Sequence, residues 1–175
     1  NDWAFAALKT DGSVISWGGR QNGGDSSEVK AELAEGVVSV TGNEGAFAAV
    51  KTDGSVITWG ARGCGGDSSN VKAELAEGVV SVTGNDWAFA ALKTDGSVIS
   101  WGGRQNGGDS SEVKAELAEG VVSVTGNEGA FAAVKTDGSV ITWGARGCGG
   151  DSSNVKAELA EGVVSVTGND WAFAA

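Results

Sequence analysis

The sequence predicts a β-rich tandem-repeat protein in which each unit contributes two strands, one short helix and a third strand. Three observations lead to this prediction. The string KTDGSVI begins at Lys9 and returns every 42 residues, at Lys51, Lys93 and Lys135. Each copy contains short apolar or β-branched runs separated by glycine-rich turns. A unit of this size cannot bury an apolar face alone, so neighbouring units must stack to make a core.

The whole chain, 1–175, is predicted to be a single repeat array. Its units are 1–42, 43–84, 85–126 and 127–168, followed by the partial unit 169–175. Two versions of the unit alternate, and they differ at 8 of 42 positions. The first and third units, called A here, are identical, and so are the second and fourth, called B.

The first half of each unit predicts a β-hairpin. In the first unit its strands are residues 3–10 and 13–17, joined by Asp11–Gly12. Asp-Gly supplies the positive φ angles of a two-residue type I′ turn. The second strand alternates, with Ile15 and Trp17 on one face. The first strand is apolar on both faces, which predicts neighbouring layers on both sides.

The second half of the unit predicts a short helix and a strand. Within residues 25–36, Asp25 is followed three positions later by Glu28, as in a capping box, and Gly36 suits the position after a helix. This pattern predicts two to three helical turns. Residues 37–42 are β-branched and bounded by glycine, which predicts the third strand.

The A and B units differ most in bulk at their third position. Trp3, Trp87 and Trp171 stand where the B units have Gly45 and Gly129. We therefore expect each tryptophan to pack over a glycine of a neighbouring unit, which would make the structural repeat 84 residues long. These five positions are the predicted packing and assembly residues.

The two cysteines, Cys64 and Cys148, occupy the same position in the two B units. A whole A unit separates them, which is too far for a disulfide within the chain. They are predicted to be small residues in a glycine-rich loop, with an intermolecular disulfide between arrays as the alternative. No zinc site is expected, because the chain contains no histidine and no close cysteine pair.

Charge and hydropathy exclude two classes of partner. The formal net charge is −11, and the few cations are dispersed, so the chain is not expected to bind nucleic acid. No apolar run approaches the roughly 20 residues that a membrane-spanning helix needs. The acidic, glycine- and serine-rich composition favours an extracellular or cell-surface location.

The sequence offers no constellation for catalysis, so no enzymatic activity is expected. Histidine and tyrosine are absent, and Ser26 next to Asp25 is explained by capping. Calcium is the one cofactor considered, because Asp11, Asn22 and Asp25 are oxygen donors in glycine-rich turns. These residues match no known calcium-loop spacing, and turn chemistry already accounts for them, so no cofactor is expected.

The unit resembles a known repeat. AFAALKTDGSVISWG, a glycine-rich loop and VKAELAEGVVSVTGN are similar to the repeats of the regulator of chromosome condensation family, and closer to shorter tandem repeats of bacterial and protist proteins. The resemblance implies β-propeller blades. The unit is shorter than the usual repeat of that family, however, and a helix is predicted where that family has an outer strand. Four units are also fewer than the seven blades usual in that family.

Two architectures and two functions follow from these patterns. An open solenoid-like or filamentous array is favoured, and a β-propeller closed by oligomerisation is the alternative. The corresponding functions are a structural protein that assembles with itself into a fibre or surface structure, and a propeller-like module that binds a protein or glycan. The segment NDWAFAA at 169–175 repeats the first strand, and we expect that it could supply a strand to another copy.

Overall fold

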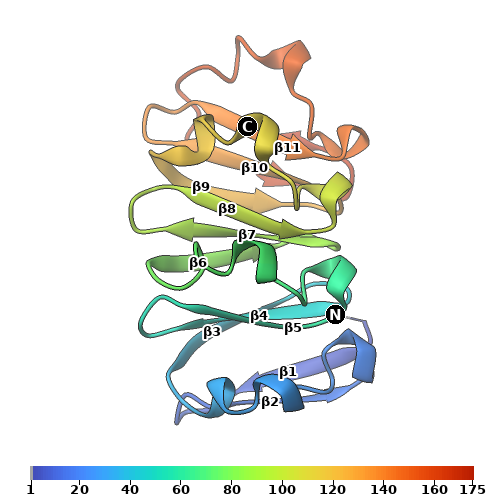
Figure 1. Cartoon of the computed structure of the whole chain (residues 1–175). Helices are drawn as coiled ribbons and strands as arrows, with labels where there is room; N and C mark the ends of the chain where they lie inside the picture. Colours follow the sequence, from blue (N-terminus) through green and yellow to red (C-terminus); the bar gives the residue numbers. More distant parts are fainter. Residues whose placement is uncertain (1) are drawn as a thin grey trace.

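The computed structural model describes residues 2–175 and consists of five antiparallel β-sheets stacked in sequence order (Figure 1). The three inner sheets have three strands each, and the two end sheets have two. Within the described residues the stack stays open, because the first and last sheets do not pair with each other. No helix in this part of the chain is long and apolar enough to cross a membrane.

Each inner sheet takes its strands from two successive units. The first layer contains β1 (Ala4–Leu8) and β2 (Val14–Gly18). The inner layers are β3 (Val37–Gly42), β4 (Ala46–Lys51) and β5 (Val56–Gly60); β6 (Val79–Gly84), β7 (Ala88–Lys93) and β8 (Val98–Gly102); β9 (Val121–Gly126), β10 (Ala130–Lys135) and β11 (Val140–Gly144). The last layer contains β12 (Thr167–Gly168) and β13 (Phe173–Ala174). The last strand of one unit therefore becomes the edge strand of the next unit's hairpin.

The hairpins form as predicted, but their turn differs from the expected type I′. The Gly12 N–H donates to the Lys9 carbonyl (3.0 Å), and the Lys9 N–H donates to the Ser13 carbonyl (2.8 Å). This is a three-residue loop in which only the glycine has positive φ, +77°. The reason is local: the Asp11 carboxylate accepts hydrogen bonds from the N–H (3.0 Å) and hydroxyl (2.6 Å) of Ser13. These bonds stabilise the three-residue loop in place of the predicted two-residue turn.

The predicted short helix is wrong in form. Residues 25–36 contain two 3₁₀ turns, η2 (Ser27–Val29) and η3 (Glu32–Ala34). Asp25 accepts a hydrogen bond from the Ser27 N–H (3.0 Å), which is an Asx turn and not the predicted capping box. A helical segment this short gains little stability from its own hydrogen bonds, so tertiary contacts determine its backbone conformation.

Other 3₁₀ turns recur at equivalent positions. They are η1 (Arg20–Asn22), η4 (Arg62–Cys64), η5 (Ser69–Val71), η6 (Arg104–Asn106), η7 (Ser111–Val113), η8 (Glu116–Ala118), η9 (Arg146–Cys148) and η10 (Ser153–Val155). These turn segments run beside the second strand of each hairpin, as the hydrogen bond from the Val56 N–H to the Leu75 carbonyl (2.9 Å) shows. They occupy the edge of the layer opposite the shared strand.

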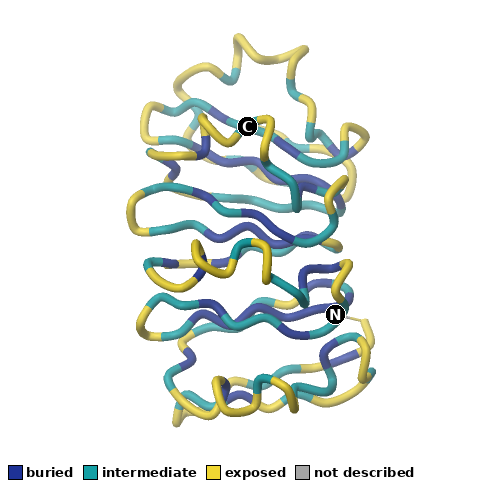
Figure 2. The backbone as a smooth tube through the Cα atoms, viewed as in Figure 1, coloured by how far each residue is buried: buried dark blue, intermediate teal, exposed yellow. Residues whose placement is uncertain are grey.

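The core consists of separate apolar layers between successive sheets. The central strand β4 is buried on both faces: Phe47 and Ala49 pack toward the first layer, and Ala46, Ala48 and Val50 pack toward the third. The small alanines let the sheets lie close together. Figure 2 shows the consequence, with dark blue backbone in the inner sheets and yellow backbone at the turns and both ends.

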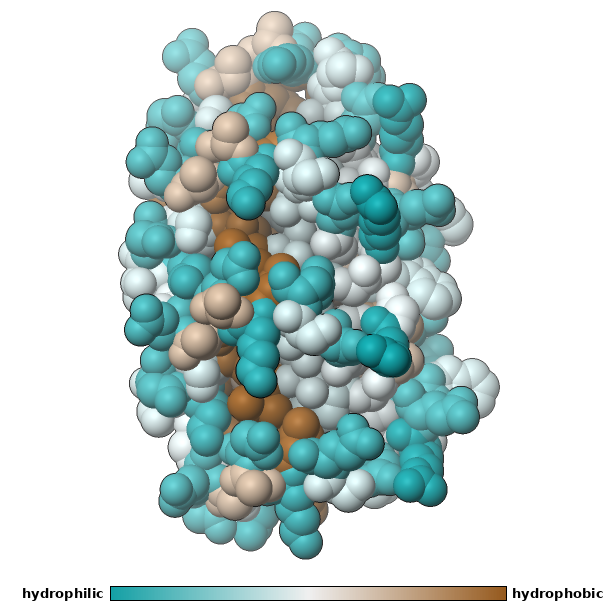
Figure 3. All heavy atoms as spheres, in the orientation of Figure 1, coloured by the Kyte–Doolittle hydropathy of each residue, from teal (hydrophilic) through white to brown (hydrophobic). Residues whose placement is uncertain are grey.

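The two junctions between the three-stranded layers are hydrogen-bonded at both edges, and the first and last junctions at one edge each. On one edge, the Trp59 indole N–H donates to the Gly23 carbonyl of the preceding unit (2.9 Å). On the other edge, the Thr41 hydroxyl donates to the Val82 carbonyl of the next layer (3.0 Å). The same two bonds recur along the stack. In Figure 3 an apolar brown band runs along the stack between hydrophilic turns.

Candidate functional site

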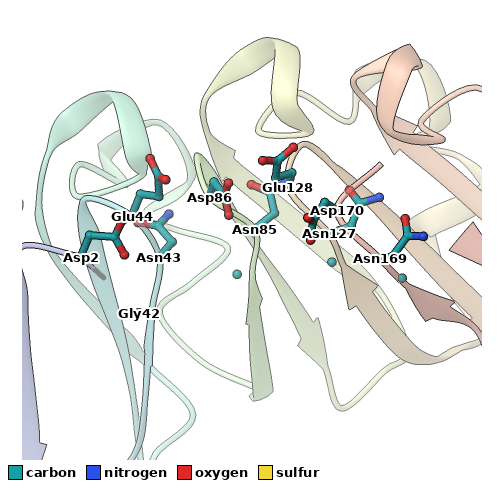
Figure 4. A pocket seen from close by; sticks show the side chains of 13 residues that line it. Asp2, Gly42, Asn43, Glu44, Asn85, Asp86, Asn127, Glu128, Asn169 and Asp170 are labelled. Carbon is teal, nitrogen blue, oxygen red and sulfur yellow. The ribbon is translucent and has the colours of Figure 1, made fainter. Parts of the chain in front are cut away.

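A groove runs along the stack where the shared strand of each layer turns into the central strand (Figure 4). Its volume is about 440 Å³; four layers line it with the same Gly-Asn-acid turn, and the first layer contributes Asp2. We call it the acidic groove and define it by the carboxylates Asp2, Glu44, Asp86, Glu128 and Asp170. The stack thus repeats one acidic side chain per layer along a single edge.

An asparagine holds the turns of the inner layers in place, and it is buried at Asn43 and Asn85. The Asn43 side-chain amide donates to the Cys64 carbonyl (2.7 Å), and its oxygen accepts from the N–H groups of Gly45 (3.1 Å) and Ala46 (2.8 Å). Asn85 and Asn127 make the equivalent bonds. Because the asparagine satisfies three backbone groups, it is a structural residue, and the acid that follows it is available to the groove.

The acidic turns are joined directly to one another. The Glu44 N–H donates to the Asp86 carbonyl (3.3 Å), and the Asp86 N–H donates to the Glu128 carbonyl (3.3 Å). Hydrogen-bonded backbones lie about 5 Å apart. Successive carboxylates are therefore well within a Debye length of about 8 Å at physiological salt, and their potentials add.

The negative charge of the groove is not neutralised by cations of the described chain. No lysine or arginine lines it. Each arginine instead pairs with an aspartate of its own loop, as Arg20 does with Asp25 (2.9 Å) and Arg104 with Asp109 (2.8 Å). Burial raises the pKa of Asp86, and the charges of Glu44 and other groove carboxylates raise it further. The folded state therefore includes electrostatic repulsion between Asp86 and the other groove carboxylates.

The acidic side chains of residues 2–175 do not gather into metal-binding groups. Among residues 2–175, no group of three acidic or cysteine side chains lies close enough to hold a metal ion. Two of the oxygen donors considered for calcium have separate tasks: Asp11 bonds Ser13, and Asp25 bonds Ser27 and Arg20. The turn chemistry expected from sequence accounts for both.

The tryptophan–glycine packing expected between units does not appear in the closest contacts. A Cβ placed on Gly45 would lie 3.0 Å from the Cys64 sulfur and 3.1 Å from the Ala61 Cβ, both of the same unit. At Gly129 the nearest atoms belong to Asn106, Ala145 and Cys148.

The A and B versions also compensate bulk within the unit. In the A unit, the Trp3 Cβ is 3.2 Å from where a Cβ on Gly19 would stand. The B unit replaces this pair by Gly45 and Ala61. The side chains of Trp3, Trp87 and Trp171 remain exposed.

Both cysteines are buried and unpaired in the described structure. Burial, and secondarily the Glu44 charge, raises the pKa of Cys64, which disfavours the reactive thiolate. A disulfide between arrays would need an accessible sulfur, and both cysteines are buried here.

The acidic groove is the feature that the sequence analysis missed. Its signal was present: the residue after the first Asn of every unit is acidic, even where Asp changes to Glu between versions. The charge is kept while the neighbouring position changes from tryptophan to glycine. Without knowing which strand ends meet, however, these five acids could not be placed in one row.

Comparisons with solved structures show which architecture the chain resembles. No family model and no curated protein matches the chain. Among solved structures, Prp20p from Saccharomyces cerevisiae matches with a TM-score of 0.58 and 18% identity, over 83% of this chain and 43% of that one. Human WBSCR16 matches with a TM-score of 0.55 and 19% identity, over 85% and 47%. The CRINKLY WD40 ectodomain of the Arabidopsis thaliana receptor kinase ACR4 matches with a TM-score of 0.52 and 15% identity, over 81% and 48%.

These neighbours are β-propeller repeat proteins, and the chain spans less than half the length of each. The Prp20p structure is described together with its binding to Gsp1p and histones. At identities below one fifth, the likeness concerns architecture only. The chain is therefore similar to propeller proteins in its β-rich repeated sheets, which form an open stack here.

Proposed function

We propose that this chain is a non-enzymatic binding module and that its acidic groove receives a basic segment of a protein partner. The observation that carries the proposal is the row of five carboxylates, one per layer, with no cation among the groove's lining residues. Such a row attracts a cationic chain from a distance and holds it along the stack.

The shape of the groove favours an extended ligand over a compact one. The carboxylates lie on successive layers, so they present a line of charge and not a single pocket. A lysine- or arginine-rich peptide has its charges spaced along a flexible backbone and can pair with several of them at once. Each exposed ion pair contributes little, about 0.5 kcal/mol, so affinity depends on the number of pairs.

The similar solved structures are consistent with this class of function. Prp20p is described as binding protein partners. The absence of histidine and tyrosine from the sequence, together with the structural use of Asn43 and its equivalents, leaves the groove with carboxylates as its main chemical groups. Charge recognition is the chemistry that such a set performs best.

The test is binding of a fluorescein-labelled decalysine peptide, measured by anisotropy at low salt. The variant Glu44→Gln/Asp86→Asn/Glu128→Gln removes three central charges. At about 0.5 kcal/mol each, the dissociation constant should rise about tenfold.

The matched control is Glu32→Gln/Glu74→Gln/Glu116→Gln, which removes the same charge from exposed outer turns. This control should bind almost as well as the parent chain. Equal weakening by the two variants would mean that only the net charge of the chain affects binding. An unchanged dissociation constant for the groove variant would show that the groove does not bind the peptide.

Self-association is a second candidate function, favoured by a separate observation. The outer face of the first layer exposes large apolar side chains, including Phe5 and Trp17, that are buried at equivalent positions inside the stack. Such a face is suited to contact with a second copy of the chain, independently of the groove.

A further inference from the structure

The outer face of the first layer has the side chains of an interior face. Phe5 and Trp17 are 62% and 50% exposed, and Ile15 lies beside them with 53% exposure. Their equivalents in the third unit, Phe89 and Trp101, are completely buried. The two hairpins have identical sequences, so the difference arises only from the presence of a preceding layer.

The first hairpin already has the conformation of its buried counterpart. The rings of Phe5 and Trp17 stack with centroids 5.5 Å apart, and those of Phe89 and Trp101 stack at 5.4 Å. The register is also the same, with Phe5 opposite Trp17 and Phe89 opposite Trp101. The face needs no rearrangement before a neighbour covers it.

The neighbour that covers Phe89 and Trp101 is a B unit, and the chain has a second B unit at its other end. Residues 43–84 bury this hairpin, and the Trp101 indole donates to the Gly65 carbonyl (3.0 Å). Residues 127–168 have the same sequence and offer Ala132, Val134 and Val140 as the corresponding surface.

A seven-residue segment occupies that second surface. Residues 169–175 have the same sequence as residues 1–7, and Phe173 packs where Phe89 packs on the inner B unit. The segment pairs with only two residues of the shared strand, Thr167 with Ala174 and Gly168 with Phe173. Val164, in the region of the shared strand, is 93% exposed. The bound segment is thus an incomplete substitute for a hairpin.

We infer that two copies of this chain associate head to tail, with the β1–β2 hairpin of a second copy replacing residues 169–175 on the first. The new junction repeats the internal one, so Trp17 of the second copy would donate to the Gly149 carbonyl of the first. The exchange replaces one strand by two and buries both rings of the Phe5–Trp17 pair. Because the interface joins two different surfaces, the copies can close into a ring, or further copies can add to form a longer array.

The experiment is sedimentation velocity of the full chain over a range of concentrations, with two variants of the same residue type. Phe5→Ala removes a side chain from the incoming face, and the dissociation constant should rise by at least about tenfold. Phe173→Ala loosens the competing segment, so association should become several-fold tighter. Opposite effects of one substitution at two positions of identical local sequence are not expected of unspecific apolar adhesion.

Further variants keep the inference falsifiable. Trp17→Ala should weaken association as Phe5→Ala does, and circular dichroism checks that each variant folds. If Phe173→Ala disturbs the last unit, the milder Phe173→Leu serves in its place. A chain that stays monomeric with and without the Phe173 substitution would overturn the inference, and so would weakening by both phenylalanine variants.

Discussion

At the residue scale, the stack depends on glycines that approach aromatic rings of the next layer. Gly65 has φ +93°, and a Cβ there would stand 2.8 Å from the Phe89 ring. Its carbonyl accepts the Trp101 indole N–H. Glycine therefore meets two demands at once: a left-handed backbone and the absence of a side chain. Gly63, two residues earlier, has neither constraint.

We expect Gly65→Ala to lower the free energy of unfolding by about 2–3 kcal/mol, because overpacking and left-handed strain add. Gly63→Ala should change it by less than about 0.5 kcal/mol, since no atom lies within 4 Å of the new Cβ. Urea denaturation followed by tryptophan fluorescence measures both. Comparable losses would show that the loop, and not the aromatic contact, limits the stability.

At the element scale, each hairpin is fastened to the preceding unit by its tryptophan. Trp101 is fully buried, stacks on Phe89 across the hairpin and donates to Gly65 of the preceding loop. One side chain thus links two strands and a neighbouring turn. The equivalent Trp17 makes the same stack within its hairpin, but its side chain is half exposed.

Replacing Trp101 by phenylalanine should therefore destabilise the fold by about 2–4 kcal/mol, since a cavity forms and the Gly65 carbonyl loses its donor. Trp17→Phe in the dilute monomer should cost less than about 0.5 kcal/mol. Thermal unfolding at low micromolar concentration compares the two variants. A large loss from Trp17→Phe under those conditions would contradict the assignment of its face as uncovered.

At the scale of the whole molecule, stacking in register gathers like charges along one edge. The acids of five layers line the same groove, and the pKa of Asp86 is raised above its ordinary value of 3.8 by burial and by its acidic neighbours. In the window above 3.8 the folded state therefore binds more protons than the unfolded state. Stability contributed by protonated Asp86 is lost as the pH rises through that window.

Asp86→Asn should accordingly raise the melting temperature at pH 7 by a few degrees, and the gain should shrink toward pH 3. Asp95 provides a control of opposite sign. Hydrogen bonds from Ser97 lower its pKa, so Asp95 stabilises the fold above pH 3.8 and loses that effect as the pH falls. Asp95→Asn should thus lower the melting temperature at pH 7. Thermal scans from pH 3 to 7 test both, and a loss of stability from Asp86→Asn at pH 7 would contradict the repulsion described here.

The local features were predictable because their causes lie within a few residues. The 42-residue period, the hairpins and the two-sided burial of the central strand follow from apolar alternation and glycine-rich turns. Where the prediction failed, a competing local bond decided the outcome. Asp11 bonded Ser13 and lengthened the turn, and Asp25 bonded Ser27 in place of capping a helix.

By itself the sequence determined that this protein is an array of near-identical β units with an acidic residue at equivalent turns. Only the tertiary structure decided that the strand Val37–Gly42 pairs with the following unit's Ala46–Lys51, and that bulk is balanced between positions such as Gly45 and Ala61. The physical reason is that strand pairing is non-local: any edge satisfies the backbone of another, so a repeated sequence does not say which edges meet. That choice of edges aligned the acids in one groove and left one apolar face at the start of the stack uncovered.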